Sequence, residues 1–345
     1  MPSVIADPGS PDTGSPVSSS AFAVLMDDLG SFETGSRIAV AVSGGPDSMA
    51  LCHLAKEWAS SRGLSVVGLT VDHRLRPEAR EEAQQVSMWL ADLEMAHETL
   101  IWEQGATVKS LDRSPQTAAR DARFSLLCEW CQKNNIDALM TAHHADDQAE
   151  TFLYRLVRGS GVDGLAAIAP ESIRKDVRIL RPLLRVTKAD LIATCAKKGQ
   201  VWVDDPSNSS DASARVRLRK IMAALEQEGL SRDRLLKTVD HMARAKSAIN
   251  SAVDELLDVA SRQEGNGVIN LNVSAVMAAP EEVGLRCLAR CLSCVSGAEY
   301  PPRFESLLGV YAALTDKEWS DRTLHGCQLR MKGIHLEVSV EQRKR

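Results

Sequence analysis

The sequence predicts an α/β fold in which helices cover both faces of a parallel sheet, followed by a smaller, mainly helical domain that ends in a β-hairpin. From Arg37 onward, short apolar runs rich in β-branched residues alternate with longer segments of helical periodicity. This alternation is typical of βαβ units, whose strands run parallel. Near the end of the chain, apolar and polar residues alternate on either side of Lys332-Gly333, which predicts the hairpin.

The expected strands of the sheet are 37–42, 65–71, 97–102 and 137–142. The helices between and after them are 48–61, 78–95, 115–134 and 146–158. Two shorter strands are expected at 178–184 and 200–203, with a helix over 187–198 between them. Further helices are expected at 214–228, 233–263, 280–296 and 302–314, and the hairpin strands at 323–331 and 334–340. Right-handed crossovers place the loops after successive strands along one edge of the sheet.

Three segments follow from this pattern. Residues 1–20 are rich in Ser, Pro and Gly, hold no Lys or Arg, and are expected to be disordered. Residues 21–228 form the predicted α/β domain. Residues 229–345 form the predicted helical domain.

Composition narrows the class of protein. The chain has 44% hydrophobic and 25% charged residues, as globular proteins do. No run of about 18 uncharged apolar residues is present, so we expect no membrane span. Residues 1–20 lack both the basic start and the apolar run of a secretory signal. The eight cysteines are therefore expected to be reduced thiols in the cytoplasm. The net charge of −5 argues against a general nucleic-acid binder. Whether the chain binds nucleic acid at a particular site depends on the local distribution of charge.

The strongest local signal is a glycine-rich turn between a strand and a helix. Its residues are Ser43, Gly44, Gly45, Pro46, Asp47 and Ser48. Adjacent glycines let the backbone approach a ligand closely, and the following helix begins with unpaired N–H groups that favour an anion such as pyrophosphate. The lysine of a Walker A loop is absent. The Asp47 carboxylate would repel phosphate unless a cation lay between them, so we assign Asp47 to Mg²⁺ or to an incoming amine.

A second cluster lies in TAHHADDQAETFLYRL (141–156), after the fourth expected strand. Its polar members are His143, His144, Asp146, Asp147 and Glu150. Asp147 and Glu150 are three residues apart, so a helix places both on one face, where they could bind Mg²⁺ or a cationic substrate. The alternative is that Asp146 caps the helix, the other two carboxylates are solvated and the histidines pack. Five such residues at one strand end favour the functional interpretation.

These motifs resemble a known family. SGGPDS after an apolar strand resembles the PP-loop signature of the N-type ATP pyrophosphatases, which have a Rossmann-like sheet. HHADDQAET followed by RLVRGSGVDGL resembles the tRNA(Ile)-lysidine synthetases within that superfamily. Four more stretches between about residues 37 and 220 are similar to this family and stand in the same order: VDHRLRPEA, ARDARFSLL, RPLL and WVDDPSN. The segment TLHGCQLRMKG from Thr323 is similar to the C-terminal part of these enzymes, although the chain is shorter than one with a full second C-terminal domain.

The resemblance implies an ATP-dependent ligase acting on the wobble cytidine of tRNA(Ile) with a CAU anticodon. ATP adenylates the C2 oxygen of the base, and free lysine then displaces AMP to give lysidine, which changes codon reading from AUG to AUA. The implied cofactors are ATP and Mg²⁺. The expected catalytic residues are Asp47, Asp147 and Glu150, and the loop 43–48 is expected to bind ATP. The expected lysine-binding residues are Arg120, Arg123, His144, Asp147 and Glu150.

The local charge fits an RNA partner. Residues 174–220 hold twelve Lys or Arg against five Asp or Glu. Binding of phosphate groups requires a local basic patch and not a positive net charge of the whole protein. The expected tRNA-binding residues are Arg215, Arg217, Arg219 and Lys220. Val216 stands where the family usually has Asn, so any function of that Asn side chain in the family is not assigned to this chain. A solvated surface with scattered ion pairs is the alternative.

Two other functions remain open at this point. Cys128 and Cys131 form one CxxC motif, and Cys287, Cys291 and Cys294 form a second group, which would suit a PP-loop tRNA cytidine thiolase with an iron–sulfur cluster. Both groups lie in expected helices among apolar residues, which favours a core role for the thiols. A non-catalytic nucleotide- or RNA-binding protein is the other alternative. The sequence leaves the oligomeric state open, with a homodimer as one option.

Overall fold

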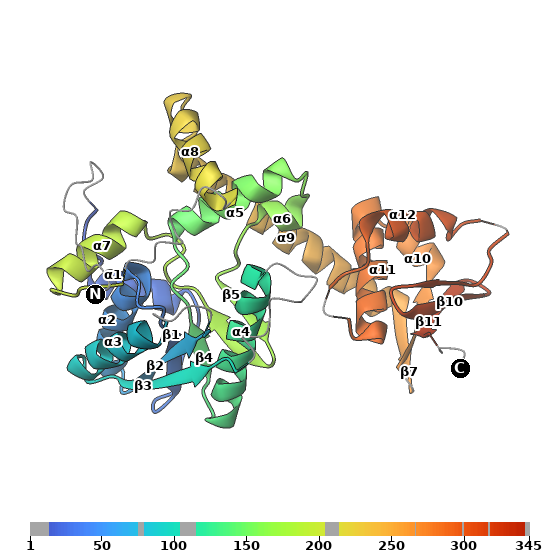
Figure 1. The fold of residues 1–345 in the computed structure, drawn as a ribbon. Coiled ribbons are helices and arrows are strands. Elements are labelled where there is room, and N and C mark those ends of the chain that lie inside the picture. Colours follow the sequence, from blue (N-terminus) through green and yellow to red (C-terminus); the bar gives the residue numbers. More distant parts are fainter. Residues whose placement is uncertain are drawn as a thin grey trace. The chain divides into compact units, whose positions relative to one another are not determined.

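The computed structural model describes residues 14–74, 79–103, 115–203, 214–265, 267–298, 300–316 and 318–341, without the side chains of 115–120, 214–216, 219, 220 and 223. The chain divides into two compact units, residues 1–240 and 241–345 (Figure 1). The boundary predicted at 228/229 lies between helices α8 (Ala214–Gln227) and α9 (Arg232–Ala260), whereas the two units divide further along the chain, inside α9.

The first unit contains a six-stranded sheet. Its strands are β1 (Arg37–Ala41), β2 (Ser65–Asp72), β3 (Ala96–Ile101), β4 (Ala138–Met140), β5 (Glu171–Arg174) and β6 (Val177–Leu180). Their order is β3-β2-β1-β4-β6-β5, and every neighbouring pair is parallel except β5 with β6. The predicted parallel α/β fold is therefore confirmed. β5, which the sequence analysis did not identify, is the antiparallel edge strand.

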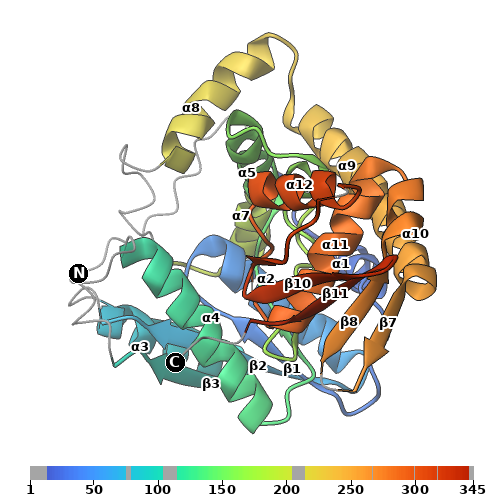
Figure 2. The same ribbon diagram turned by 90° about the vertical axis from the view of Figure 1, so that its right-hand side faces the viewer.

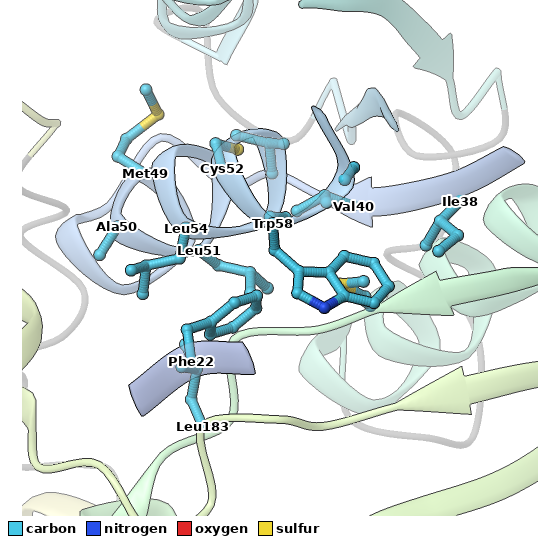
Figure 3. Close-up of a cluster of buried hydrophobic side chains, with 14 of the residues drawn as sticks. Phe22, Ile38, Val40, Met49, Ala50, Leu51, Cys52, Leu54, Trp58 and Leu183 are labelled. Carbon is cyan, nitrogen blue, oxygen red and sulfur yellow. The ribbon is translucent and has the colours of Figure 1, made fainter. Parts of the chain in front are cut away.

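Helices cover both faces of this sheet (Figure 1). They are α1 (Ser19–Asp27), α2 (Pro46–Ser60), α3 (Ala79–Asp92), α4 (Pro115–Lys133) and α7 (Lys188–Lys197). Because side chains alternate along a strand, Ile38 and Val40 of β1 join the core formed with α1, α2, α3 and α7 (Figure 3). Ala39 joins a second core on the opposite face, which contains Phe124 and Leu127 of α4.

The predicted disordered segment 1–20 differs from the structure at its end. Residues 1–13 lie outside the described residues, but α1 begins at Ser19. The Oγ of Ser18 accepts a hydrogen bond from Ala21 N and caps the helix. Val17 packs against the first core. The helix cap and the packing of Val17 offset the conformational entropy that this segment loses when it becomes ordered, which the composition of 1–20 alone did not indicate.

The remaining helices of the first unit are α5 (Ala145–Val157), α6 (Val162–Leu165), α8 (Ala214–Gln227) and the start of α9 (Arg232–Ala260). Phe152 of α5, Leu218 of α8 and Leu235 of α9 share a small core. The two helices α8 and α9 diverge from the turn that joins them (Figure 2).

The strand predicted at 200–203 is wrong. Residues 200–203 lie in no sheet, and Val203 N donates a hydrogen bond to Gly44 O (2.9 Å) in the glycine-rich loop.

The second unit has its own core and an antiparallel sheet of order β7-β8-β11-β10-β9. Its strands are β7 (Ser261–Glu264), β8 (Val268–Asn272), β9 (Arg322–Leu324), β10 (Cys327–Lys332) and β11 (His335–Val340). Its further helices are α10 (Val273–Ala278), α11 (Glu281–Ser296) and α12 (Phe304–Ala313). The hairpin β10–β11 confirms the prediction.

The helix predicted over 233–263 ends earlier, at Ala260. Residues 261–264 form β7 instead, because they pair with β8 from Ser261–Leu271 to Glu264–Val268. Within the described part of the chain, every helix is too short or too polar to cross a bilayer.

Candidate active site

The glycine-rich loop lies at the carboxyl end of β1 and leads directly into α2. Pro46 is the first residue of the helix, where its missing N–H is harmless. Ser48 is 3% exposed, and its Oγ donates to Gly45 O (3.0 Å) and accepts from Ser43 N (3.2 Å). The two serine hydroxyls lie 3.3 Å apart. The serines therefore fix the shape of the loop, while the first N–H groups of α2 present a positive dipole end to a ligand.

Gly44 lies in the left-handed region with φ +82°, and a Cβ there would be 2.8 Å from Val86 Cγ2. We expect Gly44→Ala to destabilise the protein by more than the roughly 1–2 kcal/mol that the left-handed conformation alone costs. The displaced loop should also bind ATP at least about tenfold more weakly. Gly35→Ala is the matched control, because Gly35 has φ +88° and nothing within 4 Å of its Cβ position. Equal thermal unfolding and equal ATP titrations for the two variants would contradict the close approach at Gly44.

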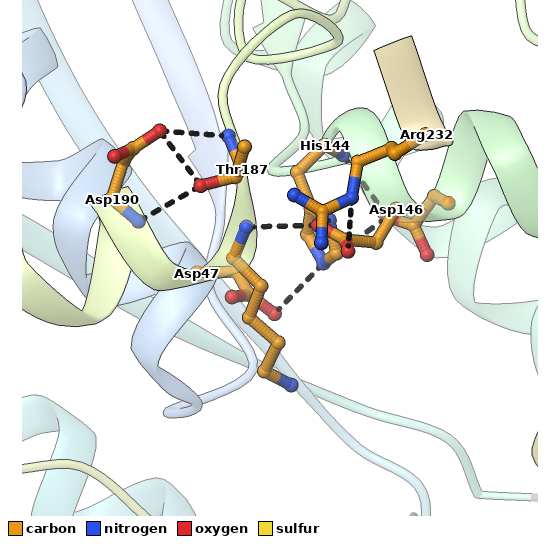
Figure 4. A network of polar contacts seen from close by, with 8 residues as sticks. Asp47, His144, Asp146, Thr187, Asp190 and Arg232 are labelled. Atoms are coloured by element: carbon orange, nitrogen blue, oxygen red, sulfur yellow. Dashed lines mark hydrogen bonds and ion pairs between the residues drawn. The ribbon is translucent and has the colours of Figure 1, made fainter. Parts of the chain in front are cut away.

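Asp47 lies in the first turn of α2 and points toward His144, which follows β4. Its Oδ2 is 3.5 Å from His144 Nε2 (Figure 4). Its Oδ1 is buried and accepts no hydrogen bond from the described residues. A buried carboxylate oxygen without a donor is costly unless a cation binds it. The residue and its setting therefore fit Mg²⁺, which prefers oxygen ligands beside phosphate groups.

His144 follows β4 and is the N-cap residue of α5. Its Nε2 lies 3.5 Å from Asp47 and 3.6 Å from Asp147 Oδ2, and its Nδ1 lies 3.4 Å from Asp146 Oδ2. Burial alone would lower the pKa of this imidazole, but the surrounding carboxylates outweigh burial and raise the pKa to about 10. His144 is therefore a buried imidazolium that joins three carboxylates near the phosphate loop.

Asp146 and Asp147 have different partners although they are adjacent. Asp147 accepts a hydrogen bond from His144 N (3.0 Å) and completes a capping box at the start of α5. Asp146 accepts from Lys188 N (2.9 Å) and lies 3.0 Å from Arg232 Nε of α9 (Figure 4). Burial would raise the pKa of Asp146, but His144, the Lys188 N–H and Arg232 lower it to about 2. Asp146 thus stays ionised and ties α5 to two other parts of the chain.

The structure brings together only part of the predicted site. Asp47, His144 and Asp147 converge, and Glu150 lies one helical turn after Asp147, only 4% exposed. The predicted alternative of solvated carboxylates is therefore wrong for Glu150. Arg123 is half-buried beside Phe124, with its guanidinium carbon 5.5 Å from the ring centroid.

The other predicted binding residues fall mainly outside the described side chains. These are Arg120, Arg215, Arg219 and Lys220. Arg217 is described, and its side chain is exposed on α8. Their assignment to lysine or tRNA remains a prediction.

The sequence analysis missed Arg232, which belongs to this cluster through Asp146. One signal could have found it. A cation in the first turn of a helix is disfavoured by the helix dipole, so Arg232 at the start of α9 needs a carboxylate from elsewhere. The sequence does not say which carboxylate that is, because Asp146 is distant along the chain.

The cysteines are mostly core residues, as predicted. Cys128 and Cys131 are buried in the core between α4 and the sheet, and Cys287 and Cys291 are buried in the second unit, whereas Cys294 is exposed. Burial raises the pKa of Cys131 to about 12, with the neighbouring Cys128 adding to the effect. Among the described residues, no three His, Cys, Asp or Glu side chains are grouped as metal ligands.

The chain is similar in sequence to known proteins. The family model of the PP-loop domain (ATP_bind_3) matches residues 17–226. The tRNA(Ile)-lysidine synthase of Rhodopseudomonas palustris is 41% identical over 281 residues, which are 81% of this chain and 80% of that protein. The enzyme of the same name from Wolbachia pipientis wMel is 34% identical over 309 residues, 89% of this chain and 71% of that protein.

A solved structure supports the fold. The U34-tRNA thiolase NcsA from Methanococcus maripaludis, with its [4Fe-4S] cluster, covers 66% of this chain and 78% of its own, with a TM-score of 0.56 and 16% identity. The parallel sheet, the loop after β1 and the domain match together define a PP-loop domain. At the level of sequence the relationship is closer still, and the chain belongs to the tRNA(Ile)-lysidine synthase family. The thiolase is a more distant relative.

Proposed function

We propose that the protein is a carbon–nitrogen ligase that joins free L-lysine to C2 of the wobble cytidine of tRNA(Ile) with a CAU anticodon. In the first step the C2 oxygen of the base attacks the α-phosphorus of ATP, and pyrophosphate leaves. In the second step the ε-amine of lysine attacks C2, the C2–O bond breaks and AMP leaves with the oxygen. The amine gives up its excess protons, and the products are lysidine, AMP and pyrophosphate.

The observation that supports this proposal best is the meeting of three carboxylates, one of them in the phosphate loop, in a member of this family. Asp47, Asp146 and Asp147 face the two cations His144 and Arg232. In these contacts the carboxylates outnumber the cations, in a place that is largely shielded from water. Such a place attracts a metal ion or an ammonium group.

The phosphate loop supplies the ATP site in this proposal. The backbone of residues 43–48 and the N-terminus of α2 bind the pyrophosphate portion, as helix N-termini do for anions. Asp47 would hold Mg²⁺, which when bound neutralises phosphate charge and favours the departure of pyrophosphate. His144 keeps Asp47 in place through the contact of its Nε2 with Asp47 Oδ2.

The lysine site uses the acidic face of α5. Asp147 and Glu150 would attract and orient the ammonium group of lysine, and His144 acts in this site through the carboxylates that it contacts. Arg120 or Arg123 would bind the lysine carboxylate, because a guanidinium can hold a carboxylate with two hydrogen bonds. The ammonium must become a neutral amine before it attacks.

The tRNA must present its wobble base out of the stack, as substrates of other base-modifying enzymes do. Arg215, Arg217, Arg219 and Lys220 would bind phosphates of the RNA near this base. We expect the reaction to take place in the cytoplasm. A homodimer stays a prediction.

Radiolabelled lysine tests the proposal directly. The assay contains ATP, Mg²⁺ and unmodified tRNA(Ile) with a CAU anticodon, and it measures label in acid-precipitable RNA. The expected result is label that depends on ATP and on the wobble cytidine, with none in a C-to-U wobble variant. Folded protein that binds ATP but transfers no label would exclude the lysine ligase and leave another PP-loop reaction.

The acidic face of α5 gives a specific prediction about lysine. We expect Glu150→Gln to raise the KM for lysine by roughly 10- to 100-fold, because it removes one charge-assisted interaction of about 1.5–3 kcal/mol. The KM for ATP should change little. Steady-state kinetics with each substrate varied separately checks this, with Glu171→Gln on the edge strand β5 as the exposed control. An unchanged KM for lysine would place the ammonium site elsewhere.

A further inference from the structure

The helix α9 carries an exposed basic stripe along one face. Its residues are Arg234, Lys237, His241 and Arg244, and all four are exposed. Their spacing of three, four and three residues keeps them on one side of a helix with 3.6 residues per turn. At a rise of about 1.5 Å per residue, the stripe is roughly 15 Å long.

These side chains have few partners among the described residues. Lys237, His241 and Arg244 make no ion pair or side-chain hydrogen bond with the described residues. Arg234 donates one hydrogen bond, to the backbone oxygen of Gly229. Two carboxylates flank the stripe. Asp240 is paired with Arg185 (3.3 Å), and Asp233 is exposed at the start of the helix.

Basic residues lie in the first half of α9 and acidic residues in the second half, which is the opposite of the distribution that stabilises a helix. Residues 232–246 hold five Lys or Arg against two Asp, whereas residues 247–260 hold three acidic residues and no Lys or Arg. The helix dipole favours carboxylates in the first turn and cations in the last turn. In α9, Arg232 and Arg234 lie in the first turn and Asp258 in the last. Helix stability therefore does not account for this arrangement.

We propose that the basic stripe binds the phosphodiester backbone of the RNA substrate. The proposal rests on the proposed function for the identity of the RNA. A row of exposed basic side chains that have no carboxylate partner among the described residues complements a polyanion, since each cation that contacts a phosphate releases counterions from the RNA. The stripe begins two residues after Arg232, which contacts Asp146 of the active-site cluster. The stripe lies further along the chain than the basic residues predicted at 215–220, with Glu226 and Glu228 between the two groups.

The double variant Lys237→Gln/Arg244→Gln tests the stripe, because Gln keeps much of the side chain and removes the charge. We expect the Kd for tRNA(Ile) transcript to rise at least about tenfold at 100 mM salt, and the slope of log Kd against log salt to fall by about 1.5 to 2. Fluorescence anisotropy between 50 and 200 mM salt measures both. The C-to-U wobble variant should weaken equally, since phosphate contacts carry no base information.

The control is Arg262→Gln/Arg303→Gln, which removes two exposed cations outside α9. It should leave the Kd and the salt slope unchanged. Thermal unfolding of both double variants shows that each is folded. An unchanged Kd and slope in Lys237→Gln/Arg244→Gln would overturn the proposal and make the stripe a solvated face. Weakening limited to wobble-cytidine RNA, or no RNA binding by the wild type, would overturn it as well. Wild-type protein that binds tRNA but ligates no lysine would reject the proposed function and leave the stripe standing.

Discussion

Asp47→Asn is expected to lower the rate of ATP-dependent pyrophosphate release by roughly a thousandfold, the scale seen when one electrostatic group is removed from an active site. Asn keeps the shape of the side chain but removes the charge that would hold Mg²⁺ beside the phosphates. We expect the free energy of unfolding to stay within about 1 kcal/mol of the wild type, because His144 and Arg232 still face two carboxylates. Release of pyrophosphate and chemical denaturation measure the two effects separately.

Asp190→Asn is the matched control for this experiment. Asp190 lies at the start of α7, where it accepts hydrogen bonds from Thr187 N (3.2 Å) and Thr187 Oγ1 (2.7 Å) (Figure 4). This variant should lose about 1 kcal/mol of stability through the weaker helix cap and keep its rate of pyrophosphate release. Normal pyrophosphate release by Asp47→Asn would remove Asp47 from the mechanism.

His144→Ala should have the largest effect on stability. Removing the imidazolium leaves the half-buried Asp47 and Asp147 without their shared cation, which we expect to cost about 3 kcal/mol at neutral pH. The pKa of His144 is raised from 6.5 to about 10 by folding. Its contribution is therefore fully present below pH 6.5 and is lost as the pH rises toward 10. The penalty of His144→Ala should shrink over this range.

His97→Ala provides a control of opposite sign. His97 donates to or accepts from Thr70 Oγ1 (2.9 Å), and burial lowers its pKa below 6.5. A histidine of this kind destabilises the wild type as the pH falls below 6.5, so the penalty of its removal should grow as the pH rises to that value and then stay level. Urea unfolding of both variants between pH 5 and 10 checks the pair of trends. A penalty for His144→Ala that stays constant over this range would show that His144 is neutral in the cluster.

The sequence predicted the parallel sheet well because its strands have a distinctive composition. β1 reads RIAVA, a short run of mostly buried apolar residues that predicts a strand and is too short for a helix. Polar strands gave no such signal. β7 reads SRQE, with three of its four residues exposed, so it continued the helical pattern of α9 in the sequence. Only pairing with β8 determines it as a strand, and pairing of that kind is not visible in local periodicity.

The site was predictable to the extent that its residues follow strand ends. Asp47 and Asp147 come after β1 and β4, and neighbouring parallel strands bring their carboxyl ends together. The role of each histidine was harder to predict. His144 is adjacent to His143, yet His144 contacts three carboxylates while His143 Nδ1 lies 2.8 Å from Thr141 Oγ1. That difference depends on the capping geometry of α5, which is a property of the folded chain.

The contact between Asp146 and Arg232 has a consequence for the order of events during protein synthesis. The phosphate loop, the His144 cluster and Arg232 come from widely separated stretches of the chain. Domains fold as the ribosome delivers their residues, and contacts between distant residues form late. The nascent chain can build β1 to β4 and the loop early, but Asp146 gains its arginine only after the start of α9 has emerged. Until then the growing protein carries a phosphate loop next to an incompletely neutralised acidic cluster.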